Sequence, residues 1–256
     1  MMANSAAKAG LRTRNEASPH HEGAEAQVGS LDWHRISEDL DAFGAATTGP
    51  LLSPEECSCL AGAYSDDAVF RSRIVMSRHG FGRGEYKYYA YPLPDPIEHL
   101  RSGLYRALAP IANRWHEAMG LHTRFPDGHA AFITRCHEAG QTRPTPLLLR
   151  YEAGDYNCLH QDLYGEHVFP LQVAILLSVP GRDFTGGELV LTEQRPRMQS
   201  RAEVVPLKQG EGVVFAVNSR PVKGARGTYR VNMRHGVSRI RSGLRHTLGI
   251  IFHDAR

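Results

Sequence analysis

Residues 147–162 read LLLRYEAGDYNCLHQD, and this stretch holds the two features that govern the interpretation of the chain. It begins as a short apolar and aromatic run, typical of a buried β-strand, and a glycine follows where a turn is expected. It ends on His160 and Asp162, which are separated by one residue. Two imidazoles and one carboxylate hold one face of a mononuclear iron(II) centre and leave the other face open. Because the chain has 14 histidines, such a pair also arises by chance, and its surroundings must support it.

The remainder of the second half consists of short apolar segments that alternate with glycine-containing turns. In order, these are the apolar run 171–177, FTGGEL at 184–189, VVPL at 204–207, QGEG at 209–212, VVFAV at 213–217, HGV at 235–237 and RHTLGIIFH at 245–253. Short β-branched and aromatic runs at this spacing predict an all-β sandwich or barrel.

This order of elements, over roughly residues 145 to 255, resembles the prolyl-hydroxylase-like branch of the iron(II)/2-oxoglutarate dioxygenases. The resemblance implies an α+β fold: a double-stranded β-helix (jelly-roll) core with N-terminal helices packed on its major sheet. It also implies Fe(II) as cofactor and 2-oxoglutarate and O2 as co-substrates. The expected organisation is a disordered leader at 1–30, a helical cap with a short β segment at 31–144, and the catalytic core at 145–256.

The resemblance assigns roles to individual residues of the core. The residues that match the iron ligands are His160, Asp162 and His235. Arg245, ten residues beyond the last ligand, matches the basic residue that binds the 5-carboxylate of 2-oxoglutarate. Thr247 and Tyr151 match a hydroxyl and a tyrosine that contact the same carboxylate. A guanidinium suits this function because its donors form a fixed fork, and Arg245 and Thr247 point to the same side of a strand.

Other histidines compete for the third ligand position. His246 is the main alternative, but it has the opposite strand parity to Arg245. We therefore assign His235. His167 and His253 are expected to be structural or to support the ligands. A jelly roll that has kept its shape without the metal is the alternative to the whole set, and the presence of Arg245 disfavours it.

The first half of the chain predicts three helices. Apolar residues recur at helical spacing over 33–43, a capping box at 53–56 opens a helix to about Tyr64, and a long amphipathic pattern runs from 95 to 120. We expect these helices to pack on the outer face of the major sheet. Residues 1–30 are rich in Ala, Ser, Glu, His and Gly without an apolar h-region, so they are expected to be a disordered leader and not a signal peptide.

A glycine- and aromatic-rich segment separates the second and third helices. It reads HGFGRGEYKYY at 79–89, and its glycines do not form a phosphate-binding loop because no Walker lysine follows. A plain edge strand is one interpretation. A loop and strand that cover the mouth of the active site is the other, and it makes Arg83, Tyr86 and Tyr88 candidate substrate contacts.

Composition limits the classes of protein that the chain can represent. A hydrophobic fraction of 41% and a charged fraction of 22% are ordinary for a globular protein, and the longest aliphatic run, 173–177, is too short to cross a bilayer. Four cysteines, Cys57, Cys59, Cys136 and Cys158, do not make a disulfide framework in a chain of this size. Together with the expected iron(II), they predict a cytoplasmic location.

Positive charge is concentrated at the C-terminal end. Residues 195–256 contain 13 lysines and arginines against three acids, and 212–253 contain no acid. The segment 218–232 was expected to be an insert that brings basic residues towards the metal end of the barrel. Its candidate substrate contacts are Arg220, Lys223 and Arg226. Such charge favours an anionic substrate, including nucleic acid, although the arginines could instead pair with the acidic first half.

The resulting hypothesis is an Fe(II)- and 2-oxoglutarate-dependent dioxygenase that hydroxylates or oxidatively demethylates an unidentified substrate, releasing succinate and CO2. One alternative is a demethylase of alkylated nucleic acid, since such enzymes belong to the same superfamily. The other is a metal-binding or interaction module without catalysis. The sequence predicts no membrane partner and leaves the oligomeric state open.

Overall fold

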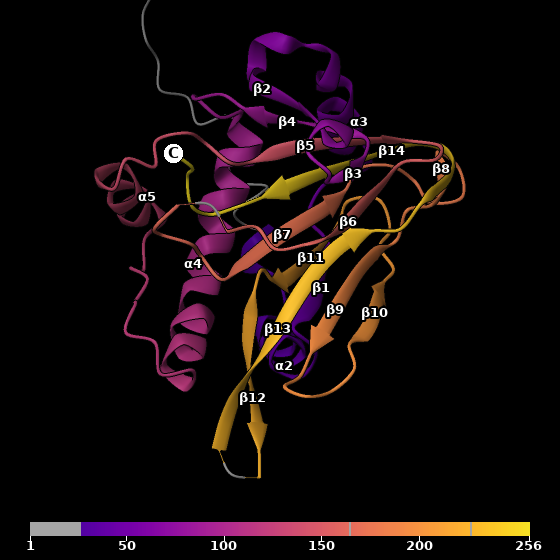
Figure 1. Ribbon diagram of the computed structural model, residues 1–256. Coiled ribbons are helices and arrows are strands. Elements are labelled where there is room, and N and C mark those ends of the chain that lie inside the picture. The colour runs from indigo at the N-terminus through magenta and orange to yellow at the C-terminus, as the bar shows by residue number, and fades with distance from the viewer. Residues whose placement is uncertain (1–26, 164, 226) are drawn as a thin grey trace, which may run out of the picture.

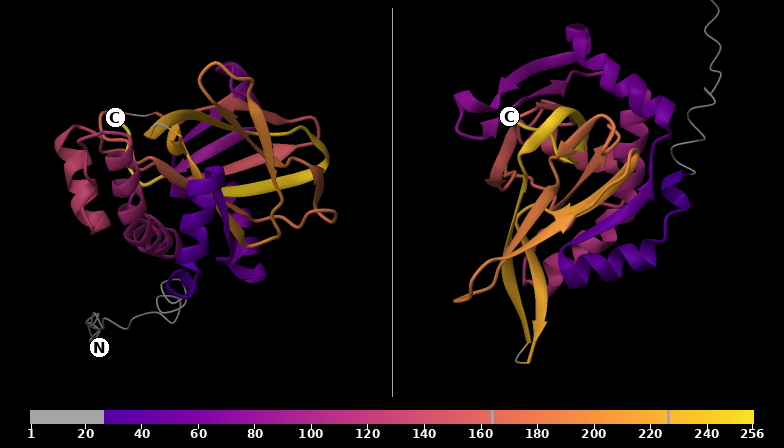
Figure 2. Two further views of the ribbon diagram at one scale, coloured as in Figure 1. Left: turned by 90° about the horizontal axis from the view of Figure 1, so that it is seen from below. Right: turned by 90° about the vertical axis from the view of Figure 1, so that its right-hand side faces the viewer.

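The computed structural model of the chain describes residues 27–163, 165–225 and 227–256. Two antiparallel sheets face each other in it, and helices cover one of them (Figures 1 and 2). The eight-stranded major sheet has the order β1 (Ala45–Pro50), β11 (Glu211–Ala216), β7 (Leu171–Leu176), β14 (Ile240–Ile250), β5 (Leu147–Glu152), β4 (Glu85–Tyr89) and β2 (Phe70–Val75), with β8 (Phe184–Gly186) paired to β14. The six-stranded minor sheet has the order β10 (Arg201–Val205), β9 (Leu189–Gln194), β13 (Gly227–Val237), β6 (Tyr156–His160) and β3 (Gly82–Arg83), with β12 (Ser219–Gly224) paired to β13.

The three predicted helices form where the sequence signals place them. They are α2 (Trp33–Phe43), α3 (Pro54–Gly62) and α4 (Asp95–Ala118). Gly44 ends α2 with a left-handed φ of 77°, and Ser53 and Glu56 form the reciprocal capping box of α3. A fourth helix, α5 (His129–Glu138), was not predicted. Short 3₁₀ turns occupy Ala63–Ser65, Asp67–Val69 and Met76–Arg78.

The helices and the major sheet share the largest apolar core. One face of α4 contributes Leu100, Leu104, Leu108 and Trp115, all at most 1% exposed. The outward-facing residues of β7 and β14 pack against this face, and they include Val173, Ile175, Leu248 and Ile250. This confirms the predicted packing of N-terminal helices on the major sheet. Two smaller clusters lie between the sheets, so the inner faces are only partly filled.

Strands from before residue 145 complete both sheets. β1 pairs with β11 at one edge of the major sheet, and β4 pairs with β5 near the other. β3 pairs with β6 and forms an edge of the minor sheet. The segment 79–89 therefore crosses from one sheet to the other: its glycine-rich part lies at an edge, whereas β4 lies inside the major sheet between β5 and β2.

The expected leader at 1–30 lies outside the described residues, except for its last four positions. These positions are ordered, because Val28 is buried and its carbonyl accepts a hydrogen bond from the Trp33 indole. Disorder was thus the wrong expectation for residues 27–30. Among the described residues, no helix is long and apolar enough to cross a membrane.

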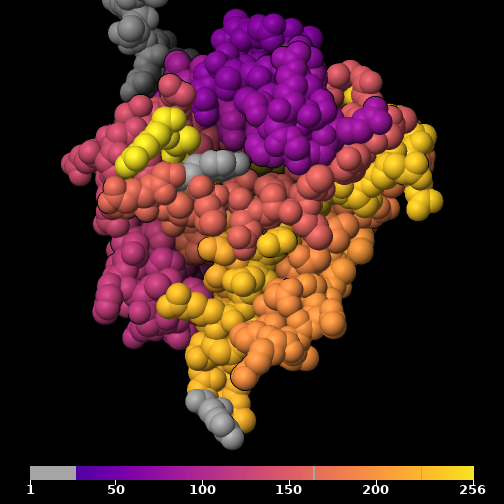
Figure 3. Space-filling model, in the orientation of Figure 1, coloured from indigo at the N-terminus to yellow at the C-terminus, as the bar shows by residue number. Residues whose placement is uncertain are grey.

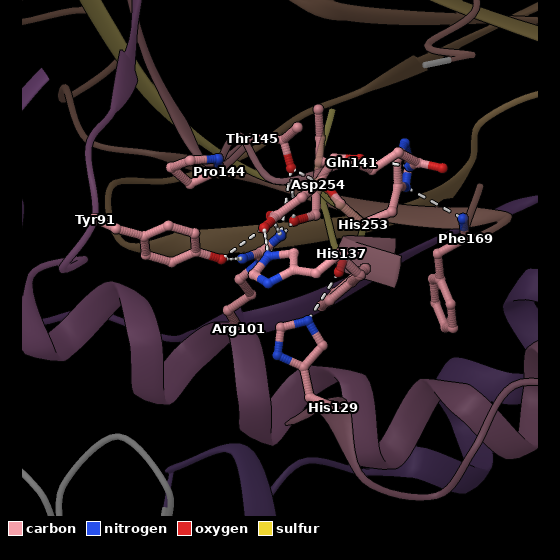
Figure 4. Close-up of polar contacts among 12 residues, drawn as sticks. Tyr91, Arg101, His129, His137, Gln141, Pro144, Thr145, Phe169, His253 and Asp254 are labelled. Atoms are coloured by element: carbon pink, nitrogen blue, oxygen red, sulfur yellow. Dashed lines mark hydrogen bonds and ion pairs between the residues drawn. The ribbon is translucent and has the colours of Figure 1, made fainter. Parts of the chain in front are cut away.

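A buried polar cluster joins α4 to the C-terminal segment (Figure 4). The Arg101 guanidinium donates to Asp254 Oδ1 at 2.8 Å and to the Ile251 carbonyl at 2.9 Å, and both side chains are at most 1% exposed. Tyr91 and His137 also contact Asp254 Oδ2, each at 2.8 Å. Burial raises the pKa of Asp254, but Arg101 outweighs this effect and holds the pKa below its ordinary value. The cluster fixes the helices against the sheet that holds the site.

Candidate active site

A cavity of about 210 Å³ opens between the two sheets. Its metal end is lined by His160, Asp162 and His235, and its opposite end by Tyr151, Arg245 and Thr247. Both groups arise from strand pairing. His235 on β13 is the register partner of His160 on β6, and Arg245 on β14 is the register partner of Tyr151 on β5. Side chains of directly opposed residues lie on the same face of a sheet, so each pair meets at the cavity.

The three predicted metal ligands form one compact group. Their ligand atoms all lie within 4.8 Å of one another. His160 Nε2 is 3.4 Å from Asp162 Oδ1, and His235 Nε2 is 3.2 Å from Asp162 Oδ2. Metal–ligand bonds of about 2.1 Å at right angles place neighbouring ligand atoms about 3 Å apart. The spacing therefore fits three ligands on one face of an ion, as a mononuclear iron(II) site requires.

Hydrogen bonds hold the His160 imidazole and the Asp162 carboxylate in forms that can bind a cation. His160 Nδ1 lies 2.8 Å from the Cys158 carbonyl, and a donor at Nδ1 leaves Nε2 as an unprotonated ligand atom. Burial raises the pKa of Asp162, but the hydrogen bonds to His160 and His235 outweigh it and hold the pKa well below the usual range. The carboxylate is thus ionised and supplies the charge that a divalent metal needs.

The opposite end of the cavity holds a buried cation without a carboxylate partner in the described part of the chain. Arg245 is 3% exposed, its NH1 donates to Thr247 Oγ1 at 2.5 Å, and its Nε has no hydrogen-bond partner. The guanidinium lies 5.8 Å from the ring of Tyr151 and 5.7 Å from that of Phe184. Burial lowers the pKa of Arg245 to about 10. An unpaired buried guanidinium is costly, and a carboxylate ligand would satisfy it with paired hydrogen bonds. The residues present therefore fit both iron and 2-oxoglutarate.

The competing histidines lie away from the cavity. The ring of His246 is on the outer face of the major sheet, 5.8 Å from Tyr64, as its strand parity predicted. His253 is buried, and its Nδ1 accepts a hydrogen bond from the Phe169 backbone at 3.2 Å.

The three aromatic-segment candidates divide into two groups. Tyr86 and Tyr88 point inward from β4 and line the cavity, with ring centroids 5.3 Å apart and the rings edge to face. Arg83 is on β3, outside the cavity lining, and its exposed guanidinium is 3.8 Å from Asp155.

The basic insert does not reach the cavity mouth, which corrects the expectation for Arg220. β12 and β13 pair as a hairpin, and the end of this hairpin that is farther from His235 projects away from the body of the molecule (Figures 1 and 2). Arg220 is 1% exposed and forms an ion pair with Glu193, and it also donates to the carbonyls of Asp41 and Ala42. A buried guanidinium with these partners is structural, so it is not free to meet a substrate.

The hairpin geometry also carries Lys223 away from the metal. Lys223 is opposite Thr228, seven residues along β13 from His235, and at about 3.3 Å per residue this is about 23 Å. Arg226 lies outside the described residues. The insert was expected to fold back to the metal end, but an uninterrupted strand pairing extends it in the opposite direction.

Two residues of the cavity were not foreseen as site residues. Gln172 on β7 lies beside Asp162 and His235. Phe81 lines the cavity, is 46% exposed and stacks on His79 with centroids 5.3 Å apart. The only signal for Gln172 was its place as a polar residue within the apolar run 171–177, which is unusual for a buried strand.

The fold and this site define a 2-oxoglutarate/iron(II) oxygenase, and comparison with known proteins agrees. A Pseudomonas putida prolyl-4-hydroxylase matches with a TM-score of 0.52 and 13% identity, over 88% of this chain and 99% of that one. A Trichoplax adhaerens prolyl hydroxylase, in complex with a hypoxia inducible factor peptide fragment, matches with a TM-score of 0.52 and 14% identity, over 93% of each chain. These likenesses confirm the jelly-roll fold.

Sequence comparison then gives the family. Residues 84–255 match the Oxygenase-NA family, described as "Oxygenase, catalysing oxidative methylation of damaged DNA", and the chain belongs to this family. Proteins from two strains of Mycobacterium tuberculosis, both named as uncharacterized, are 52% identical over 199 residues, which are 76% of this chain and 85% of each relative. A Burkholderia pseudomallei oxidoreductase of the 2OG-Fe(II) oxygenase family is among the similar structures, which implies Fe(II), 2-oxoglutarate and O2, and the His160, Asp162 and His235 group could hold the iron.

Proposed function

We propose that the protein is a dioxygenase that couples the oxidative decarboxylation of 2-oxoglutarate to the hydroxylation of a C–H bond in a separate substrate. The observation that carries the proposal is the single cavity with His160, Asp162 and His235 at one end and the unpaired Arg245 at the other. In the reaction, 2-oxoglutarate, O2 and R–H give succinate, CO2 and R–OH. One atom of O2 enters succinate, and the other enters the new hydroxyl group.

The residues of the chain bind and orient the reactants. Iron(II) held by His160, Asp162 and His235 would supply the activation of O2. Arg245 and Thr247 would bind the 5-carboxylate of 2-oxoglutarate, with Tyr151 beneath the guanidinium. Because this end of the cavity is buried, the co-substrate would extend from Arg245 towards the metal and its carboxylate would be shielded from water.

The aromatic residues on one side of the cavity restrict which kinds of substrate group can enter it. Phe81, Tyr86 and Tyr88 line the cavity, and apart from the metal ligands and Arg245 its described lining contains no charged side chain. An uncharged, flat or apolar group would fit this wall. If the oxidised carbon is an N-methyl group, the N–CH2OH product breaks down to formaldehyde and an N–H group, and the reaction becomes a demethylation.

Nucleic acid is the second candidate substrate, and specific observations favour it. The family description names damaged DNA. The structure also places an exposed aromatic pair, Phe81 on His79, at the cavity, and exposed aromatic rings stack on unpaired bases. Arg83 follows Phe81 by two residues and is available to a phosphate. The four free cysteines and the iron(II) site favour a reducing compartment, which we propose to be the cytoplasm.

The test is succinate release by the iron-loaded protein. Wild type should convert 2-oxoglutarate to succinate slowly without a substrate, and Asp162→Ala should not. Alkylated oligonucleotides, peptides and amino acids are then screened for faster release. Stimulation by a methylated oligonucleotide that disappears steeply with salt identifies the demethylase, whereas stimulation by a peptide identifies a protein hydroxylase. No succinate from wild type under any of these conditions would refute the proposed function.

A further inference from the structure

Gln172 occupies a position between two of the metal ligands. It lies on the inner face of β7, opposite Phe215 of β11, and is 7% exposed. Its Nε2 donates to Asp162 Oδ2 at 2.9 Å and lies 3.3 Å from His235 Nε2. β7 is paired on both sides, to β11 and to β14, so the backbone that carries this side chain is held firmly.

The orientation of the Gln172 amide is set by its neighbour. Gln172 Nε2 lies 2.9 Å from Asp162 Oδ2, and an Asp that binds a metal does so as a carboxylate. An ionised carboxylate accepts hydrogen bonds and donates none, so the NH2 end of the amide must face it. The carbonyl end then points elsewhere. A flipped Gln172 amide would place its oxygen against the Asp162 carboxylate oxygen, and two acceptors repel each other.

The carbonyl oxygen is left without a protein partner. Gln172 Oε1 is buried and makes no hydrogen bond to any described residue. A buried acceptor without a donor costs about 1–3 kcal/mol, so a bound water or a group of a ligand is expected to supply the donor. Gln172 lines the cavity whose described wall is otherwise mostly apolar. A donor that enters this cavity is therefore the partner that would satisfy it.

We propose that Gln172 acts at both ends of its amide. Its NH2 group is a positioning group that fixes the Asp162 carboxylate for the metal, and its carbonyl oxygen accepts a hydrogen bond from the primary substrate. The substrates so selected carry an N–H or O–H donor beside the carbon that is oxidised, as secondary amides and nucleobases do. This inference rests on the proposed function for its second half only.

The positioning half is tested by cobalt(II) titration of the full chain, followed by the visible absorption of the ion. Gln172→Met keeps the length of the side chain and removes both polar ends. Because loss of a group that holds a metal ligand weakens binding by about 10–100-fold, the dissociation constant of cobalt(II) should rise about 10-fold. Gln172→Asn keeps an amide that is too short to reach, and it should weaken binding as well.

A control variant separates this effect from the loss of a glutamine side-chain hydrogen bond elsewhere, at a half-buried position. The Gln209 side chain donates to the Leu177 carbonyl and is not part of the cavity lining. Gln209→Met should leave cobalt(II) affinity unchanged. Thermal unfolding of each metal-free variant checks that it is folded. Wild-type cobalt(II) affinity in both folded Gln172 variants would overturn the positioning half.

The acceptor half is tested with two small amides that differ by one donor. N-methylacetamide has an N–H group and N,N-dimethylacetamide has none. At high millimolar concentration, only N-methylacetamide should shift the cobalt(II) spectrum of the 2-oxoglutarate complex of wild type, and Gln172→Met should respond to neither. An equal response of wild type to the two amides, or none to either, would overturn this half. Wild type that binds cobalt(II) but never forms succinate with iron would instead refute the proposed function.

Discussion

The two sheets of the jelly roll differ in what covers their outer faces. β7 in the major sheet has no exposed residue, because its outward side chains lie beneath α4. β13 in the minor sheet alternates between exposed and buried residues from Arg230 to His235, and Figure 3 shows β13 and β9 open to the viewer with no helix over them. A strand that is buried on both faces reads as a continuous apolar run, and one with a solvated face alternates.

The residues proposed to bind the co-substrate lie on the covered sheet, and the two histidines proposed to bind the metal lie on the open sheet. The helix-covered sheet supplies Arg245 and Tyr151, which are at most 3% exposed. The open sheet supplies His160 and His235, and exposed apolar residues lie on β6 and just after it, among them Tyr156, Leu159 and Leu163. In the proposed function, the buried sheet would thus provide the shielded site for the carboxylate of 2-oxoglutarate, and the open sheet the side from which the substrate approaches. Substitutions in the two sheets should therefore have different consequences.

The largest effect is expected at the metal end. Asp162→Ala removes both a ligand and the charge that balances the metal, so measurable retention of iron(II) or cobalt(II) should be abolished. His235→Ala should also lose the metal, whereas His246→Ala should keep it, because His246 lies on the outer face of the major sheet. Metal content after gel filtration measures this. Metal retained by His235→Ala and lost by His246→Ala would reverse the ligand assignment.

A large loss of stability is expected beneath the covered sheet. Arg101→Met leaves Asp254 buried without its main partner, and breaking such a pair costs about 3–5 kcal/mol in the free energy of unfolding. The control is Arg114→Met, because Arg114 and its partner Asp41 are both about half exposed and such pairs contribute at most about 1 kcal/mol. Urea denaturation measures both. Equal losses would show that the buried cluster in Figure 4 does not anchor the helices.

The co-substrate site should respond next. Arg245→Ala would leave the 5-carboxylate of 2-oxoglutarate unpaired, and the loss of one partner of a buried charged pair costs about 2–5 kcal/mol. The dissociation constant of 2-oxoglutarate should rise by about 30-fold or more, while metal affinity is retained. Isothermal titration with the cobalt(II) form gives both values. Wild-type affinity for 2-oxoglutarate in this variant would mean that another cation binds the co-substrate.

Acid should destabilise the covered sheet and the helices packed on it through three buried histidines. Burial lowers the pKa of His129 to about 3 and that of His246 and His253 to about 4. A folded-state pKa below the unfolded value of about 6.5 gives stability that is complete above pH 6.5 and is lost as pH falls towards 4. Each histidine should remove up to about 1.4 kcal/mol per pH unit in this window. Denaturation of the metal-free chain between pH 7.5 and 5 measures the slope, and His246→Gln should reduce it. An unchanged slope in that variant would contradict the assignment.

The smallest effect is expected at the end of the projecting hairpin. Lys223→Ala should change the free energy of unfolding by less than about 0.5 kcal/mol, because the side chain is exposed. Arg220→Ala, three residues earlier, should be clearly destabilising through Glu193. Succinate formation without substrate should be equal in wild type and Lys223→Ala. A loss of this basal activity would show that the hairpin reaches the site after all.

Local patterns in the sequence were sufficient for the parts of the fold that depend on near neighbours. The capping box at Ser53, the apolar stripe of α4 and the parity of Arg245 and Thr247 each depend on residues that are only a few positions apart. Each was confirmed. The same parity placed His246 on the opposite face from Arg245. Helix α5 was missed because its buried residues, among them Phe132 and Cys136, form only a short stripe.

By itself, the sequence determined an all-β core from its short apolar runs and turns. The resemblance carried by its order of motifs then implied the jelly-roll class, the His160, Asp162 and His235 group and the role of Arg245, because these motifs lie in a fixed order along the chain. Only the tertiary structure decided how the arginines are used. Arg220 and Lys223 are three residues apart and chemically alike, yet one is paired with Glu193 in the interior and the other is exposed on a hairpin. The contact of Gln172 with Asp162 depends likewise on two strands meeting in space. Which partner a charge or an amide finds depends on long-range packing, and no local period encodes it.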